Sequence, residues 1–253
     1  MFINRISELN KLGRNQGKLA VIFGRRRVGK TALVLEYQRT FPSTAEFYYS
    51  QAIEGSESLQ VSQICEEIKP LIPDVPIHSW KDFFTLLSKF DRKALLVIDE
   101  FPYLVKTQPS LPSMMQKWLD HQCPEGVQLI LLGSSQTMMH DVFLKSSSPL
   151  YERASEIMQI RPLGYHHFCE AKSLDPLAKE SYLAFSIVGG IPKYWEYIHG
   201  EPNILTLTDE LYFEVGSRLE NEPDRLLKDE NIVGERASKV DSGAGGQRRC
   251  QTF

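Results

Sequence analysis

Long hydrophobic runs are missing from this chain of 253 residues. No stretch approaches the roughly 18 apolar residues that a membrane-spanning helix needs, so we expect no membrane partner. The N-terminus begins Met-Phe-Ile-Asn-Arg-Ile, which is charged and amphipathic and unlike a secretory signal. Together these two absences predict a cytoplasmic protein.

Cysteine is also scarce. The four cysteines, at positions 65, 123, 169 and 250, are scattered along the chain and include no C-x-x-C pair. The sequence therefore predicts neither a zinc site nor a disulfide framework.

Neither sign of charge dominates the composition. The chain has 29 Lys and Arg against 32 Asp and Glu, which gives a net charge of −3. This balance provides no bulk attraction to nucleic acid or to anionic membranes, although a local basic face would still be compatible with it. With 42% hydrophobic and 24% charged residues, the chain has the composition of an ordinary globular protein of one large or two modest domains.

Against this ordinary background, one glycine-rich loop carries a specific signal. Residues 24–31 read Gly-Arg-Arg-Arg-Val-Gly-Lys-Thr, which fits the phosphate-loop pattern G-x-x-x-x-G-K-[ST] without a mismatch. The apolar run 19–23 before it predicts a buried strand, and residues 31–37 after it predict a helix. This context argues against a coincidental glycine turn and predicts a nucleotide site.

Each residue type in the loop has a chemical reason. Glycines let successive N–H groups approach phosphate oxygens at the positive end of a helix. We expect Lys30 to reach the β- and γ-phosphates and Thr31 to offer its hydroxyl to Mg²⁺. One of the three arginines is expected to neutralise phosphate charge while the others face solvent or a partner. The predicted nucleotide-binding residues of the loop are Gly24, Arg25, Arg26, Arg27, Val28, Gly29, Lys30, Thr31 and Ala32.

The acidic pair Asp99-Glu100 closes the most hydrophobic run of the chain, residues 94–98. An aspartate at this place can hold the Mg²⁺ shell, and the glutamate beside it can polarise an attacking water. Two acids that merely cap a strand end are the alternative, but the upstream phosphate loop favours the catalytic interpretation. The pair also argues against a small-molecule kinase, which needs no base to activate water.

Ser134 and Ser135 follow another apolar run, residues 127–133. For the parallel sheet of a P-loop protein we expect the strand order 5-1-4-3-2, which places the end of that run between the phosphate loop and the acidic pair. A hydroxyl there, with Ser135 as our candidate, would orient the water or sense the γ-phosphate. A plain helix N-cap is an equally good interpretation of either serine.

Arg153 follows a serine-rich loop at residues 146–149. Its guanidinium is a candidate arginine finger that acts across a subunit interface. The sequence does not choose between that role and a solvated surface arginine.

Five apolar runs that alternate with helical patterns predict an α/β fold: a parallel five-stranded sheet of the P-loop NTPase type, sandwiched by helices. Trp80, Phe83 and Phe84, at helical spacing, are expected in its core. From residue 165 only helical patterns follow. We therefore predict an ATPase core at 1–164, a small helical lid at 165–215, and a linker with a disordered tail at 216–253, because the tail has too little apolar surface to offset its ordering entropy.

Six motifs that occur in order give the chain a specific resemblance. It resembles the archaeal-type ATPase family, found also in bacteria, within the AAA+/STAND branch of P-loop NTPases, over about residues 1–230. Members usually continue into a winged-helix domain, and here 219–230 resembles the linker to such a domain, so we interpret the chain as C-terminally truncated. The motifs lie at residues 2–9, 24–31, 95–102, 133–135, 149–153 and 189–194.

The resemblance implies more than the motifs alone. It implies a core with an additional strand and a catalytic glutamate, a helical lid, and ATP with Mg²⁺ as the ligand. It also implies that Asn4 and Arg5 border the adenine pocket. Residues 189–194 would bring the lid against the nucleotide, with Pro192, and in second place Lys193, close to it.

The sequence thus predicts an enzyme that hydrolyses ATP with Mg²⁺ to drive a conformational change. Its alternative is a nucleotide-gated switch with little hydrolysis that acts on a protein or DNA partner. Members of this branch often need oligomerisation for turnover, so a homo-oligomer is compatible with both. The predicted catalytic residues are Lys30, Glu100, Ser135 and Arg153, and the predicted metal ligands are Thr31 and Asp99.

Overall fold

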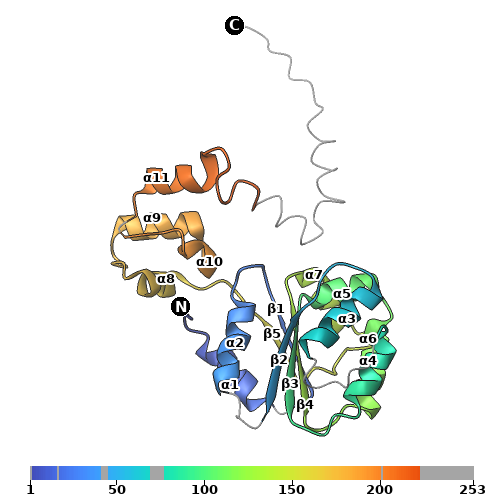
Figure 1. Ribbon diagram of the computed structural model, residues 1–253. Coiled ribbons are helices and arrows are strands. Elements are labelled where there is room, and N and C mark those ends of the chain that lie inside the picture. Colours follow the sequence, from blue (N-terminus) through green and yellow to red (C-terminus); the bar gives the residue numbers. More distant parts are fainter. Residues whose placement is uncertain (1, 16, 41–44, 69–76, 201, 223–253) are drawn as a thin grey trace. The chain divides into compact units, whose positions relative to one another are not determined.

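The apolar runs of the sequence become the strands of one parallel sheet (Figure 1). The computed structural model describes residues 2–15, 17–40, 45–68, 77–200 and 202–222. The strands pair in the order β2-β3-β4-β1-β5, and every pairing is parallel. This is the predicted order 5-1-4-3-2 read from the opposite edge, so the predicted fold class is confirmed. The strands are β1 (Leu19–Phe23), β2 (Glu46–Gln51), β3 (Ala94–Asp99), β4 (Val127–Gly133) and β5 (Glu156–Gln159).

Helices cover both faces of this sheet. In Figure 1, α1 and α2 lie on one side and α3 to α7 on the other. The crossover through α2 runs from β1 past two strands to the edge strand β2, and the later crossovers run in the opposite direction. Because parallel crossovers are right-handed, the two directions place their helices on opposite faces. The helices are α1 (Ile6–Arg14), α2 (Lys30–Thr40), α3 (Glu57–Glu67), α4 (Trp80–Leu87), α5 (Phe101–Thr107), α6 (Leu111–His121) and α7 (Gln136–Phe143).

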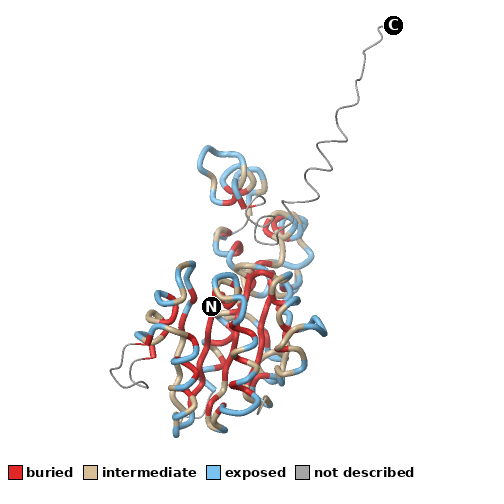
Figure 2. The backbone as a smooth tube through the Cα atoms, turned by 90° about the vertical axis from the view of Figure 1, so that its right-hand side faces the viewer, coloured by how far each residue is buried: buried red, intermediate tan, exposed pale blue. Residues whose placement is uncertain are grey.

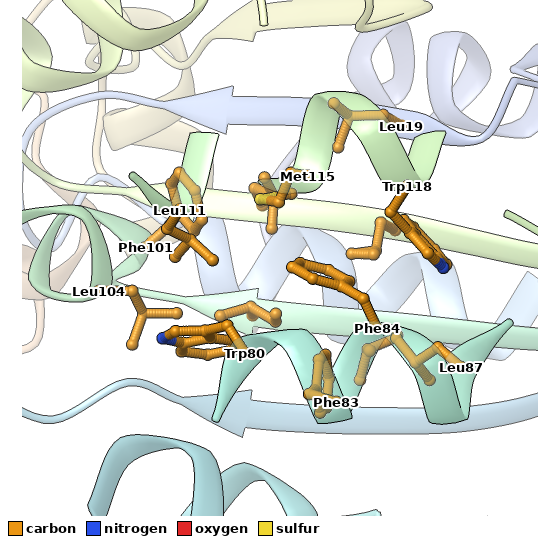
Figure 3. Packing of buried hydrophobic residues seen from close by; sticks show 14 of the residues in the cluster. Leu19, Trp80, Phe83, Phe84, Leu87, Phe101, Leu104, Leu111, Met115 and Trp118 are labelled. Carbon is orange, nitrogen blue, oxygen red and sulfur yellow. The ribbon is translucent and has the colours of Figure 1, made fainter. Parts of the chain in front are cut away.

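A large aromatic and aliphatic core lies between the sheet and helices α3 to α7 (Figure 3). The ring of Phe84 in α4 stacks on that of Trp118 in α6, with ring centroids 5.4 Å apart. The edge of Trp80 meets Phe83 at 5.5 Å. Such pairs add to the stabilisation that burial of their apolar area gives. The expectation that residues 80, 83 and 84 belong to the core is confirmed, since all three are buried.

The central strands are buried on both faces, as Figure 2 shows by the buried colour along them. In β1, Leu19, Val21 and Phe23 belong to the core under α3–α7, whereas Ala20 and Ile22 are buried on the other face. This explains why the strands read as continuous apolar runs rather than as alternating patterns.

The sequence patterns described above predict no helix at residues 101–107, where the structure has α5. In the structure Pro102 lies in the first turn of α5. A proline is tolerated there because the first N–H groups of a helix have no intrahelical partner.

Three further helices follow the sheet: α8 (Tyr165–Lys172), α9 (Lys179–Val188) and α10 (Pro192–Trp195). Aromatic side chains hold them together, with Phe168 of α8 5.4 Å from Trp195 of α10 and 5.5 Å from Phe185 of α9, measured between ring centroids. We call α8 to α10 the lid helices. They belong to the same compact unit as the sheet, and this unit ends at Pro202.

A second compact unit begins at Asn203. It contains α11 (Ile204–Thr208), which continues into the π-helical turn η2 (Asp209–Phe213). The backbone N–H of Leu219 donates to the carbonyl of Leu211 at 2.9 Å, and both side chains are buried. The grouping of 165–215 as one lid stays a prediction, and the predicted tail beyond residue 222 lies outside the described residues. Among the helices that the structure describes, none is long and apolar enough to cross a membrane.

Candidate functional site

The phosphate loop connects the carboxyl end of β1 to the first turn of α2, as the sequence predicts. Its backbone takes three unusual conformations, with φ of 152° at Gly24, 64° at Arg27 and 103° at Gly29. At Gly29 an added Cβ would meet nothing within 4 Å, whereas at Gly24 it would lie 2.4 Å from the carbonyl oxygen of Ile160. Both the close approach of Ile160 and the backbone conformation therefore favour glycine at position 24.

We expect Gly24→Ala to lower the free energy of unfolding by about 2 kcal/mol or more, because a strained φ alone costs about 1–3 kcal/mol and the new methyl group would also displace the backbone beside it. Chemical denaturation measures the change. Gly13→Ala is the matched control: its Cβ would meet nothing within 4 Å in helix α1. That change should leave stability equal or raise it by up to about 1 kcal/mol. Equal stability of the two variants would contradict the prediction.

Lys30 is almost fully buried, with 7% of its surface exposed. Its ammonium donates to the carbonyl oxygens of Gly24 at 2.8 Å and Arg25 at 3.2 Å, both within the loop. Burying a cation is costly unless oxygen atoms surround it. The loop therefore holds the lysine head beside the turn where the phosphate oxygens of a nucleotide would lie.

The two sequence motifs meet at Asp99. The hydroxyl of Thr31, 68 residues away in the chain, donates to Asp99 Oδ2 at 2.6 Å. The hydroxyl of Tyr49 in β2 donates to the same oxygen at 2.8 Å. The other carboxylate oxygen, Oδ1, accepts from the backbone N–H of Glu100 at 2.8 Å. The phosphate loop and the acidic pair are therefore two walls of one site.

Glu100 lies between β3 and α5 in a left-handed backbone conformation, with φ of 54°. Its Oε2 accepts from the hydroxyl of Ser134 at 2.6 Å and from the backbone N–H of Ser134 at 3.3 Å. Its Oε1 lies 4.0 Å from Nε of Arg26 in the phosphate loop. The glutamate carboxylate is thus fixed between the end of β4 and the phosphate loop.

The two serines after β4 make different contacts, and it is Ser134, not the predicted Ser135, that contacts Glu100. The hydroxyl of Ser135 accepts from the backbone N–H of Met138 at 3.4 Å and caps α7, which is the alternative that the sequence left open. Ser134 contacts Glu100. A role of Ser135 toward the γ-phosphate stays a prediction, and Ser134 joins the candidate site.

The three loop arginines have three different surroundings. Arg25 is exposed. Arg26 donates to the hydroxyl of Tyr103 at 3.3 Å, next to Glu100. The guanidinium of Arg27 lies over the ring of Tyr194 in α10, 5.7 Å from its centroid. Arg27 therefore links the phosphate loop to the lid helices by a cation–π contact. Val28 is buried beneath the loop, whereas Ala32, in the first turn of α2, is exposed.

Arg5, which the resemblance places at the adenine pocket, is buried and bonded to backbone. Its Nη2 donates to the carbonyl of Val28 at 3.2 Å and to that of Arg161 at 2.7 Å. The guanidinium thus ties the N-terminal segment to the phosphate loop and to the segment that leads into α8. The neighbouring Asn4 donates from Nδ2 to Nε2 of His167 in α8 at 2.7 Å.

Pro192 is the first residue of α10, and its neighbour Lys193 is exposed and paired with Glu196. Gly190 brings this segment against the connection between β5 and α8. Gly190 accepts from the N–H of Leu163 at 2.8 Å, and a Cβ on Gly190 would lie 2.1 Å from the carbonyl oxygen of Leu163. The approach of residues 189–194 to a nucleotide, with Pro192 close to it, stays a prediction.

Arg153 lies at the amino ends of the strands, whereas the phosphate loop lies at their carboxyl ends. It precedes β5, whose amino end is next to the amino end of β1, since the N–H of Ser155 donates to the carbonyl of Leu19. Its Nε and Nη2 donate to the carboxylate of Asp120 at 3.1–3.2 Å. Because the phosphate loop follows the carboxyl end of β1, Arg153 does not face the site of its own chain. A role as a finger toward a second subunit stays a prediction.

The side-chain oxygens of Thr31, in the first turn of α2, and of Asp99, at the carboxyl end of β3, fit a hydrated Mg²⁺ ion. This ion prefers oxygen ligands and binds through one or two protein groups together with phosphate oxygens. The hydroxyl of Thr31 commits its proton to Asp99, which leaves its lone pairs for a cation. Thr31 and Asp99 are therefore the residues that would hold the ion.

Comparison with known proteins agrees with this geometry. Residues 2–198 match the family described as an ATPase domain predominantly from Archaea. An uncharacterised protein of Methanocaldococcus jannaschii is 32% identical over 216 residues, which cover 79% of this chain and 46% of that relative. This chain therefore spans less than half of the relative's length.

Solved structures show the same fold at low sequence identity. A Walker-type ATPase of Pyrococcus abyssi superimposes with a TM-score of 0.57 and 16% identity, over 96% of this chain and 77% of the other. The ORC1 protein of Aeropyrum pernix, solved in complex with DNA, gives a TM-score of 0.56 and 14% identity, over 99% of this chain and 80% of the other. Sequence, site geometry and fold therefore agree, and the chain belongs to the ATPase domain family found predominantly in Archaea.

Proposed function

We propose that this protein binds ATP with Mg²⁺ and hydrolyses it to ADP and phosphate. The observation that carries the proposal is the hydrogen bond of 2.6 Å between Thr31 and Asp99, which joins the phosphate loop to the acidic pair. Glu100 directly follows Asp99 in the chain and can serve as the base. A phosphate loop, a metal-binding aspartate and a base are the groups that attack of water on the γ-phosphate requires.

Each residue has a distinct task in this reaction. Lys30 binds the β- and γ-phosphate oxygens and stabilises the charge that they gain in the transition state. Glu100 orients the attacking water and accepts its proton, while Ser134 holds the Glu100 carboxylate through the 2.6 Å hydrogen bond. Thr31 and Asp99 would hold Mg²⁺, which would neutralise charge at the phosphates when bound.

Two contacts connect the phosphate loop to the lid helices and to the segment before them. Arg27 contacts Tyr194 of α10, and Arg5 bonds both to the phosphate loop and to the segment before α8. A phosphate group that binds the guanidinium of Arg27 would weaken its cation–π contact with Tyr194. We infer that this is how the ATP cycle would drive a conformational change.

Phosphate release from ATP by the purified chain, in the presence of Mg²⁺, tests the proposal. We expect release that disappears when Mg²⁺ is chelated. A wild-type rate no higher than that of Lys30→Ala would overturn the ATPase assignment.

A nucleotide-gated switch with little hydrolysis is the second candidate, and the position of Glu100 favours it. Its carboxylate is engaged by Ser134 and faces Arg26, so the base is held before any nucleotide arrives. In that case Ser134→Ala should raise phosphate release, whereas in the ATPase it should lower it. Size-exclusion mass with a non-hydrolysable ATP analogue adds a second readout, because assembly only with nucleotide favours the switch.

The partner would be a second copy of this chain, another protein or DNA. A structure of the same fold was solved in complex with DNA, which motivates the DNA test. Arg153 would complete the site of a neighbouring copy only in a homo-oligomer. Mobility shift with duplex DNA, with and without ATP, and sedimentation of the chain alone would separate these partners.

A further inference from the structure

Tyr49 contacts the candidate metal site although no sequence motif includes it. Its hydroxyl donates to Asp99 Oδ2 at 2.8 Å, the same oxygen that accepts from Thr31 at 2.6 Å. The other oxygen, Oδ1, accepts from the N–H of Glu100 at 2.8 Å. Three donors, each from a different part of the chain, thus fix both oxygens of one carboxylate.

The register of the sheet brings Tyr49 to this place. Strands β2 and β3 are parallel, with Tyr49 opposite Val97 and Gln51 opposite Asp99. Since side chains alternate along a strand, residues 97 and 99 share a face, and Tyr49 lies on that face one step before Asp99. The long phenol side chain spans this diagonal step, which a serine or threonine would not.

The Tyr49 hydroxyl is the donor in this contact, since an ionised carboxylate only accepts hydrogen bonds. Burial, together with the negative charge of Asp99, raises the pKa of Tyr49 above its ordinary value, which agrees with a phenol that keeps its proton.

We propose that Tyr49 is a positioning residue that turns Asp99 toward Thr31 and so sets how tightly the nucleotide site holds Mg²⁺. This inference rests on the proposed function, because it concerns the same Mg·ATP site. Groups that hydrogen-bond to a metal ligand orient that ligand, and their loss lowers metal affinity about 10–100-fold. Tyr49 would make this contribution from a strand that contains no part of either nucleotide motif.

The test is Tyr49→Phe, which removes one oxygen atom and keeps the ring. Binding of a fluorescent ATP analogue is titrated against Mg²⁺, so that the readout is affinity and not turnover. We expect the Mg²⁺ concentration for half-maximal enhancement of binding to rise about tenfold, with unchanged affinity for the analogue in EDTA. Tyr48→Phe is the matched control, since its hydroxyl donates to Glu46 instead of to Asp99, and it should titrate like the wild type.

Several results would overturn the inference. An unchanged Mg²⁺ requirement in Tyr49→Phe would show that Asp99 needs no third donor, and a lower requirement would show that the phenol competes with the ion. Equal loss of affinity in EDTA would indicate a general defect of the pocket. These results would leave the proposed function standing. A wild-type chain that binds no nucleotide would overturn the proposed function, and this inference with it.

Discussion

Lys30→Ala is expected to weaken ATP binding by about 10- to 100-fold, since a hydrogen bond to a charged group contributes about 1.5–3 kcal/mol and each 1.4 kcal/mol is a factor of ten. The buried ammonium lies within the loop, bonded to the carbonyls of Gly24 and Arg25. Alanine leaves those carbonyls without this cation and the phosphates without a counter-charge. Titration calorimetry with ATP and Mg²⁺ measures the loss.

The matched control for this variant is Lys11→Ala. Lys11 is exposed on α1 and its ammonium lies 3.9 Å from a carboxylate oxygen of Glu156, so its removal should change affinity little. Thermal unfolding without nucleotide separates a binding defect from a folding defect. Retention of wild-type affinity by a folded Lys30→Ala protein would show that the loop does not bind phosphate.

Glu100→Gln is expected to lower the rate of phosphate release by about 10²-fold or more, because loss of a general base costs about 10²–10⁴-fold. Glutamine keeps the length of the side chain and can still accept from Ser134, but it cannot take the proton of the attacking water. ATP affinity should remain close to that of the wild type, since glutamine keeps the size of the side chain and only the 4.0 Å ion pair with Arg26 of the phosphate loop is lost. Single-turnover phosphate release, together with equilibrium binding, measures both quantities.

Glu66→Gln serves as the control for the loss of one negative charge, because Glu66 is exposed on α3. It should release phosphate at the wild-type rate. If Glu100→Gln also retains the wild-type rate, Glu100 is not the base. If it loses rate and affinity together, the glutamate supports the pocket and does not act in the chemical step.

Much of the fold could be predicted from local patterns. The strands are buried on both faces and therefore appear as continuous apolar runs, and the lid helices follow where the pattern becomes helical only. Helix α5 could not be predicted in this way. Pro102 stops a strand, but it is also an accepted residue for the first turn of a helix, and the sequence does not distinguish the two.

The candidate site was predicted in its motifs but not in its contacts. Two adjacent serines after β4 look alike in the sequence, yet Ser134 bonds to Glu100 and Ser135 caps α7. Their directions depend on where the strand ends and the helix begins, which is uncertain by a residue or two. Arg5 is similar: its acceptors, the carbonyls of Val28 and Arg161, lie 23 and 156 residues away.

The sequence by itself determined where the phosphate loop and the acidic pair lie in the chain, together with the five strands that place them. Such features depend on residue type, on short spacings and on the periodicity of burial, all of which are local. Only the tertiary structure decided that Tyr49 and Thr31 donate to the same oxygen of Asp99 and that Ser134 rather than Ser135 contacts Glu100. It also decided that Arg153 lies at the amino ends of the strands, away from the phosphate loop. These facts depend on the register between strands and on the side from which each chain segment arrives, and no short stretch of sequence contains that information.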